Sequence, residues 1–101
     1  QGASTTGEFN TSLGGLSIGA GVTTGDYNTA IGYAAGNDLT SGEKNVFLGA
    51  GAGENITTGA FNTALGYGAL STENAYGRNV AIGYLALATL DAAADAYNVA
   101  I

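Results

Sequence analysis

An asparagine recurs along this chain every 17 to 19 residues and opens the same short phrase each time. The phrases begin N-T-S-L-G, N-T-A-I-G, N-V-F-L-G, N-T-A-L-G, N-V-A-I-G and N-V-A-I. Their asparagines are Asn10, Asn28, Asn45, Asn62, Asn79 and Asn98. A period of this length is typical of stacked folds in which each repeat is one coil that contacts only its neighbours. It predicts an all-β parallel β-solenoid or β-roll of about six coils with a period of ~17 residues.

Each phrase has the pattern of a short strand with two different faces. Counted from the asparagine, positions +1 and +3 hold threonine or aliphatic residues, and position +2 is small except at Phe47. This alternation has the period of a β-strand. We expect the smooth +2 face to approach a second chain, with Phe47 in a locally wider gap or facing solvent. The candidate inter-chain residues are Ala30, Ala64 and Ala81.

Corners are predicted on either side of that strand. Glycine at position +4 fits a turn that a Cβ would obstruct, and the asparagine fits a corner where its side chain stacks as a ladder. A second short strand is expected after the glycine, ending near Leu39 and Ile56, with Thr-Thr-Gly closing the coil. The predicted corner glycines are Gly14, Gly32, Gly49, Gly66 and Gly83.

The repeats indicate one repeat domain over residues 1–101. Regular coils are expected over about 7–87 and an irregular final coil over 88–101. Residues 85–96 are rich in alanine, which favours helix, so we expect the last full coil to bulge, to carry a helical turn, or to lead to a different neighbouring module. Because the last phrase stops before its glycine, we expect an excerpt of a longer array.

Composition argues against several functions. The chain has no histidine and no cysteine, so we expect no enzyme, no catalytic or metal site and no cofactor. A net charge of −6 argues against nucleic-acid binding, and no apolar run is long enough for direct membrane insertion. Glu8, Asp26 and Glu43 share position −2, where a calcium site is the alternative to a solvated acidic edge.

Two aromatic files are the candidate binding or stacking surfaces. Position −1 holds Phe9, Tyr27, Lys44, Phe61, Arg78 and Tyr97. Because coils stack about 4.8 Å apart, each cation should lie between two rings, within cation–π range. Position +5 holds Tyr33, Tyr67 and Tyr84, interrupted by glycine or alanine. Such rings either bind sugars or proteins, or cover corners inside an assembly.

Self-association is expected from the thin core. A narrow, glycine-rich coil buries little apolar surface against the conformational entropy of ordering it, so a cyclic assembly of several copies would add burial and hide strand edges.

The phrases N-T-A-L-G-Y-G-A-L at residues 62–70 and N-V-A-I-G-Y-L-A-L at residues 79–87 resemble the head repeats of trimeric autotransporter adhesins and the repeats of phage tail fibres. The resemblance implies a left-handed, homotrimeric β-roll at a cell surface or on a virion. It also implies that the +1 and +3 side chains, such as Val80 and Ile82, point into the roll, with Ala81 outward. This chain departs from the adhesin pattern in its longer coil and in threonine at inward positions.

The sequence therefore predicts a structural segment of an extracellular trimeric fibre that acts as a rigid shaft and takes part in attachment to a glycan or protein receptor. One alternative is a self-assembling filament whose subunits stack end to end without a receptor. Another is an ice-binding solenoid, although Thr23-Thr24 and Thr57-Thr58 offer only one outward threonine file.

Overall fold

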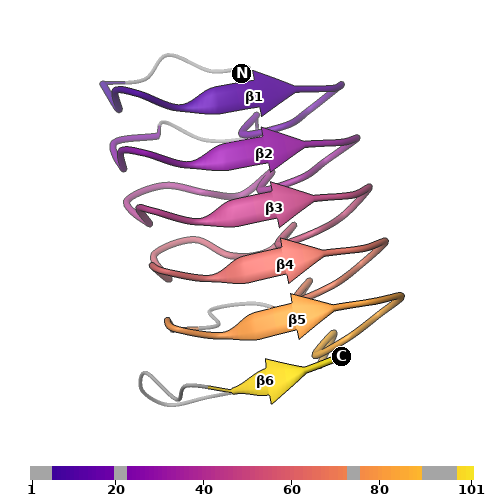
Figure 1. The fold of residues 1–101 in the computed structure, drawn as a ribbon. Coiled ribbons are helices and arrows are strands. Elements are labelled where there is room, and N and C mark those ends of the chain that lie inside the picture. Colours follow the sequence, from indigo (N-terminus) through magenta and orange to yellow (C-terminus); the bar gives the residue numbers. More distant parts are fainter. Residues whose placement is uncertain (1–5, 20–22, 73–75, 90–97) are drawn as a thin grey trace.

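A computed structural model describes residues 6–19, 23–72, 76–89 and 98–101 and shows a β-solenoid (Figure 1). Successive strands stack in sequence order to form one parallel six-stranded sheet, and the described residues contain no helix. The all-β, parallel solenoid predicted from the repeat is confirmed. The strands are β1 (Thr11–Leu13), β2 (Thr29–Ile31), β3 (Val46–Leu48), β4 (Thr63–Leu65), β5 (Val80–Ile82) and β6 (Val99–Ala100).

The strands pair so that equal repeat positions face each other. Ala64 pairs with Ala81, and Ala81 pairs with Ala100 even though the last interval is two residues longer than the one before it. Register follows the repeat because a slip of one residue would move each strand's buried side chains to the solvent face.

Only one side of each coil is a strand. The expected second strand is absent from the described residues, which form turns there. Ala34 and Gly36 have φ angles of 58° and 59°, in the left-handed region, which a β-strand does not allow. Backbone hydrogen bonds still join the coils on this side, as between Gly36 N and Ala52 O at 2.9 Å.

Of the alternatives for the alanine-rich stretch, a helical turn is absent from the part that the structure describes. Residues 84–89 form the same kind of turn as in the other coils. Leu85 and Leu87 have φ angles of 55° and 51°, which a right-handed helix excludes. The remainder of the alanine-rich stretch, residues 90–96, lies outside the described residues.

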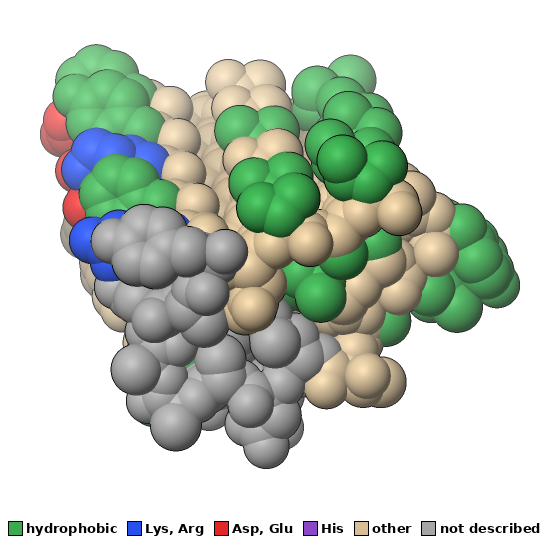
Figure 2. Space-filling view, turned by 60° about the horizontal axis from the view of Figure 1, so that its bottom comes forward, with side chains coloured by type: hydrophobic (Ala, Val, Ile, Leu, Met, Phe, Trp, Pro, Cys, Tyr) green, Lys and Arg blue, Asp and Glu red, His purple; other side chains and the backbone are tan. Residues whose placement is uncertain are grey.

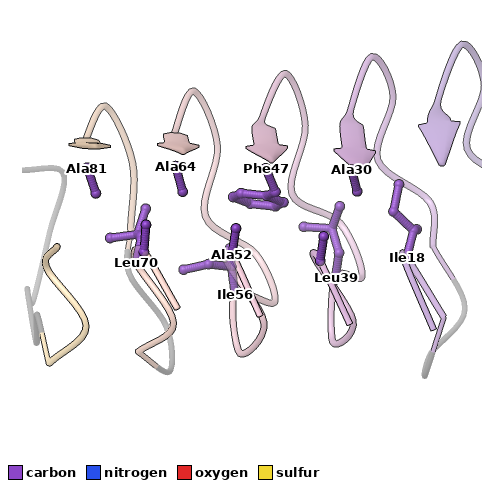
Figure 3. Close-up of a cluster of buried hydrophobic side chains, with 11 residues drawn as sticks. Ile18, Ala30, Leu39, Phe47, Ala52, Ile56, Ala64, Leu70 and Ala81 are labelled. Atoms are coloured by element: carbon purple, nitrogen blue, oxygen red, sulfur yellow. The ribbon is translucent and has the colours of Figure 1, made fainter. Parts of the chain in front are cut away.

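The strand faces are inverted relative to the sequence prediction. Ala64 is 0% exposed and points inward, whereas Leu65 beside it is 43% exposed. The core is filled from the turn side, where Leu39, Ile56 and Leu70 are buried and lie opposite the strand alanines (Figure 3). Because these side chains already occupy the narrow interior, the strand has room for little more than a methyl group.

Phe47 is the exception, and it is also buried. Its ring fits because the turn glycines Gly36 and Gly53 stand where other coils have Ile18 and Leu70. A Cβ on Gly36 would lie 2.9 Å from Phe47 Cδ2, and one on Gly53 would overlap the ring. A large strand residue is thus matched by the absence of side chains in the opposite turn.

Candidate functional site

The asparagines form a buried ladder along one corner of the solenoid. Asn28 Oδ1 accepts hydrogen bonds from Asn45 N and Asn45 Nδ2, both at 3.0 Å. Asn45 Nδ2 also donates to Gly59 O at 2.9 Å, and Asn45 Oδ1 accepts from Asn62 N at 2.9 Å. Asn28, Asn45 and Asn62 are almost completely buried. Their side-chain polar atoms form hydrogen bonds with neighbouring coils and do not point toward solvent.

Glycine at position +4 turns the chain at the end of each strand. Gly32 has a φ of 131°, and an added Cβ would lie 2.7 Å from the carbonyl carbon of Gly49. Conformation and close approach together exclude a side chain there. The same φ region is found at Gly14, Gly49, Gly66 and Gly83.

The side chains at position −1 lie in one file along the outside. Phe9 and Tyr27 stack with centroids 5.0 Å apart and planes inclined by 13°. Lys44 Nζ lies 5.9 Å from the Tyr27 centroid and 5.4 Å from that of Phe61, and Arg78 Cζ lies 5.4 Å from Phe61. The structure therefore brings five of the six candidates together; Tyr97 lies outside the described residues.

A left-handed backbone at this position was not foreseen. Tyr27, Lys44 and Phe61 have φ angles of 60°, 55° and 60°, although none is glycine or asparagine. Such conformations cost free energy for these residue types and persist where the surroundings fix them. Here the N–H of Lys44 is bonded to Asp26 O at 2.9 Å, and the N–H of Phe61 is bonded to Glu43 O at 3.1 Å.

The acidic edge lies next to this file, so red and blue groups adjoin along one side of Figure 2. Glu43 Oε1 accepts from Lys44 Nζ at 2.8 Å, and Asp26 Oδ1 accepts from Glu8 N at 2.7 Å. Within the described ranges, no three His, Cys, Asp or Glu side chains are grouped to hold a metal.

The position +5 file is interrupted and contains a groove. Tyr67 and Tyr84 stack with centroids 5.5 Å apart, but Ala50 separates Tyr33 from Tyr67. A groove of about 240 Å³ opens at this interruption. Its lining comprises Tyr33, Ala34, Ala50, Gly51, Glu54, Tyr67, Gly68, Ser71 and Leu85.

The prediction that Ala30, Ala64 and Ala81 form an inter-chain face is wrong, because all three are buried inside their own coils. The outer face of the sheet carries positions +1 and +3 instead. Its most exposed large apolar residues are Leu13, Val46, Leu48, Leu65, Val99 and Ile101. The sequence contains a signal for this: the aliphatic residues on the turn side are enough to fill a narrow coil, so the large residues of the strand must lie outside.

Threonines do not form a double outward row at the closing corner. Thr23 is buried and donates through Oγ1 to Leu39 O at 3.0 Å, whereas Thr24 is exposed.

The fold places this chain in the class of β-solenoid repeat proteins. Comparison with protein-family models, with curated proteins and with solved structures gave no match. In the part of the chain that the structure describes, no helix is long and apolar enough to cross a membrane.

Proposed function

We propose that this chain is a structural segment of an extracellular trimeric fibre, a rigid shaft of about six left-handed coils with a role in surface attachment. The observation that supports the proposal most strongly is the exposed apolar face of the sheet. Parallel sheets are ordinarily covered on both faces. Here one face packs on the core and the other, with Leu13 at 66% and Leu65 at 43% exposure, has no cover from the described chain.

A second copy of the chain is the cover that suits this face. Its rows repeat with the spacing of adjacent strands, about 4.8 Å, so the rows of an identical chain can interdigitate with them along the whole length. Closed cyclic assembly then covers the face of every copy. The added burial also compensates for a core built largely of alanine and single aliphatic side chains. A three-fold arrangement is supported by the resemblance of the N-x-A-[IL]-G phrases to trimeric fibre repeats.

The test compares two variants that each add one negative charge. Leu65→Glu places the charge on the sheet face and should convert a trimer into monomers of 9.9 kDa in sedimentation equilibrium. Ala60→Glu is the control, because position −2 already holds Glu8, Asp26 and Glu43 in other coils, and it should leave the trimer intact. Circular dichroism checks that both variants keep the fold.

Other outcomes would decide against the trimer. If the unmodified chain is monomeric at all concentrations, the sheet face is not an interface. Long particles of chains stacked end to end, without a closed trimer, would support the self-assembling filament instead.

Attachment is proposed from the exposed rings of the two aromatic files, including Phe9, Tyr27 and Tyr84. Exposed aromatic faces stack on sugars and on protein side chains. Binding of the intact fibre to cell-surface glycans or proteins tests this part. A fibre that binds neither is a shaft without a receptor function.

A further inference from the structure

We propose that the groove between Tyr33 and Tyr67 binds an arginine side chain of a partner protein. The groove exists because Ala50 leaves one place in the position +5 file without a ring. Gly51 and Gly68, at the next position of adjacent coils, line the same groove, where another coil has Leu85. The side chain of Leu85 reaches over Gly68 and forms part of the wall, so the slot lies where the ring at Ala50 is missing.

The spacing of the coils gives the expected width of the slot. Rings in adjacent coils stack at 5.0 Å for Phe9 and Tyr27 and at 5.5 Å for Tyr67 and Tyr84. Tyr33 and Tyr67 are two coils apart, and two strand spacings amount to about 10 Å. One planar group placed between them would be at stacking distance from both.

The other file of the same molecule shows what such a slot accepts. Tyr27 and Phe61 are also two coils apart, and Lys44 Nζ lies between them at 5.9 and 5.4 Å from the two centroids. Two rings at this spacing therefore hold a cation. At position −1 the chain provides the cation itself, whereas at position +5 of the same coil it has Ala50.

The charge of the groove also favours a cation. Glu54 lines it, and its Oε2 lies 3.3 Å from where a Cβ on Gly51 would be, so the carboxylate lies close to Gly51. Among the described residues, no cation pairs with this carboxylate, because the ion pair found is between Lys44 and Glu43. A cation entering the slot would contact two ring faces and a carboxylate.

Arginine fits these groups better than lysine. Its guanidinium is planar, stacks on aromatic faces and donates two parallel hydrogen bonds to one carboxylate. The partner is therefore a protein segment that presents an exposed arginine to this acidic chain, which has a net charge of −6. This inference does not depend on trimer formation, which is tested by mass and not by ligand binding.

The experiment titrates the full chain with a short peptide that has blocked ends and one arginine as its only charged residue, and follows the tyrosine ring signals by NMR. The expected result is saturable shifts of Tyr33 and Tyr67, larger than those of Tyr84. The same peptide with glutamine in place of arginine should cause none, and the lysine peptide should bind more weakly. Equal shifts from the glutamine peptide would overturn the proposal, as would binding of methyl glycosides at this slot without binding of the arginine peptide.

Three variants locate the site. Ala50→Tyr fills the slot with the residue found at this position in other coils, so the fold is kept and binding should be lost. Glu54→Gln should weaken binding roughly tenfold, since it removes the charge-assisted hydrogen bonds. Glu43→Gln removes a carboxylate elsewhere and should leave affinity unchanged. Unaltered binding by Ala50→Tyr would show that the peptide binds elsewhere and would overturn the proposal.

Discussion

The ring of Phe47 occupies the space that a side chain on Gly53 would fill, so these two residues share one volume of the core. In the next coil the sizes are reversed, with Ala64 on the strand and Leu70 in the turn. The width of the coil therefore fixes the combined volume of the strand side chain and the turn side chain.

Exchanging the two sizes should therefore restore stability that each single change removes. Phe47→Ala should cost about 3–5 kcal/mol because of the cavity it leaves, and Gly53→Leu about 1–3 kcal/mol because of overpacking. The double variant copies the next coil, where Leu70 has a φ of 52°, and should be more stable than the sum of the two losses predicts. Urea unfolding measures the coupling; strict additivity would show that the residues do not share a volume.

Removing one asparagine from the ladder should destabilise the solenoid strongly. Asn45→Ala leaves Asn62 N and Gly59 O buried without their present partner. We expect a loss of about 2–4 kcal/mol from thermal or urea unfolding. The control is Asn55→Ala, which removes only an exposed bond from Asn55 Nδ2 to Ser71 O at 2.7 Å and should cost less than about 1 kcal/mol. Equal losses would contradict a special role of the buried ladder.

Two glycine variants separate backbone strain from close approach. Gly32 and Gly83 have φ angles of 131° and 120°. A Cβ on Gly32 would lie 2.7 Å from the carbonyl carbon of Gly49, whereas Gly83 belongs to the last coil of this 101-residue sequence that has a +4 residue, and nothing lies within 4 Å of a Cβ there. Gly83→Ala should cost about 1–3 kcal/mol from the conformation alone. Gly32→Ala should cost more, because Gly49 must also shift. Similar unfolding free energies for the two variants would mean that the approach of the backbones has no effect.

The cation between Tyr27 and Phe61 should contribute modestly. Lys44→Met keeps the aliphatic stem but removes the charge, and the expected loss is about 0.5–1 kcal/mol, the usual range for exposed cation–π contacts. A double-mutant cycle with Phe61→Leu isolates this term from the ion pair with Glu43. A coupling free energy of zero would show that Lys44 and Phe61 are neighbours in the file without stabilising each other.

Much of the fold could be predicted because repetition fixes register: asparagine, strand and glycine recur together and pair with themselves. The stacking of Tyr27, Lys44 and Phe61 follows from the same period. Alternation alone could not show which face of the strand is buried. It places Thr29 and Ile31 on one face and Ala30 on the other, and this holds whichever of the two faces the core. What decides it is the room left by Leu39 and other turn-side residues, a property of the closed coil.

The turn side was mispredicted for a local reason. Small and aliphatic residues such as Ala52 and Ile56 predict a strand. The backbone between them instead adopts a left-handed conformation at Gly53, as it does at the same repeat position in other coils. Leucine also adopts such angles at Leu70 and Leu87, so residue type gives no signal there.

Because equal positions of successive coils pair with each other, the length of this protein can change by whole coils. A copied or deleted coil preserves every type of hydrogen bond in the sheet and changes the axial reach by about 4.8 Å. Phe47 is the exception, because its ring needs glycine in its own coil and in the preceding one. Recombination among repeats would therefore be tolerated at most coil boundaries and penalised between Gly36 and Phe47.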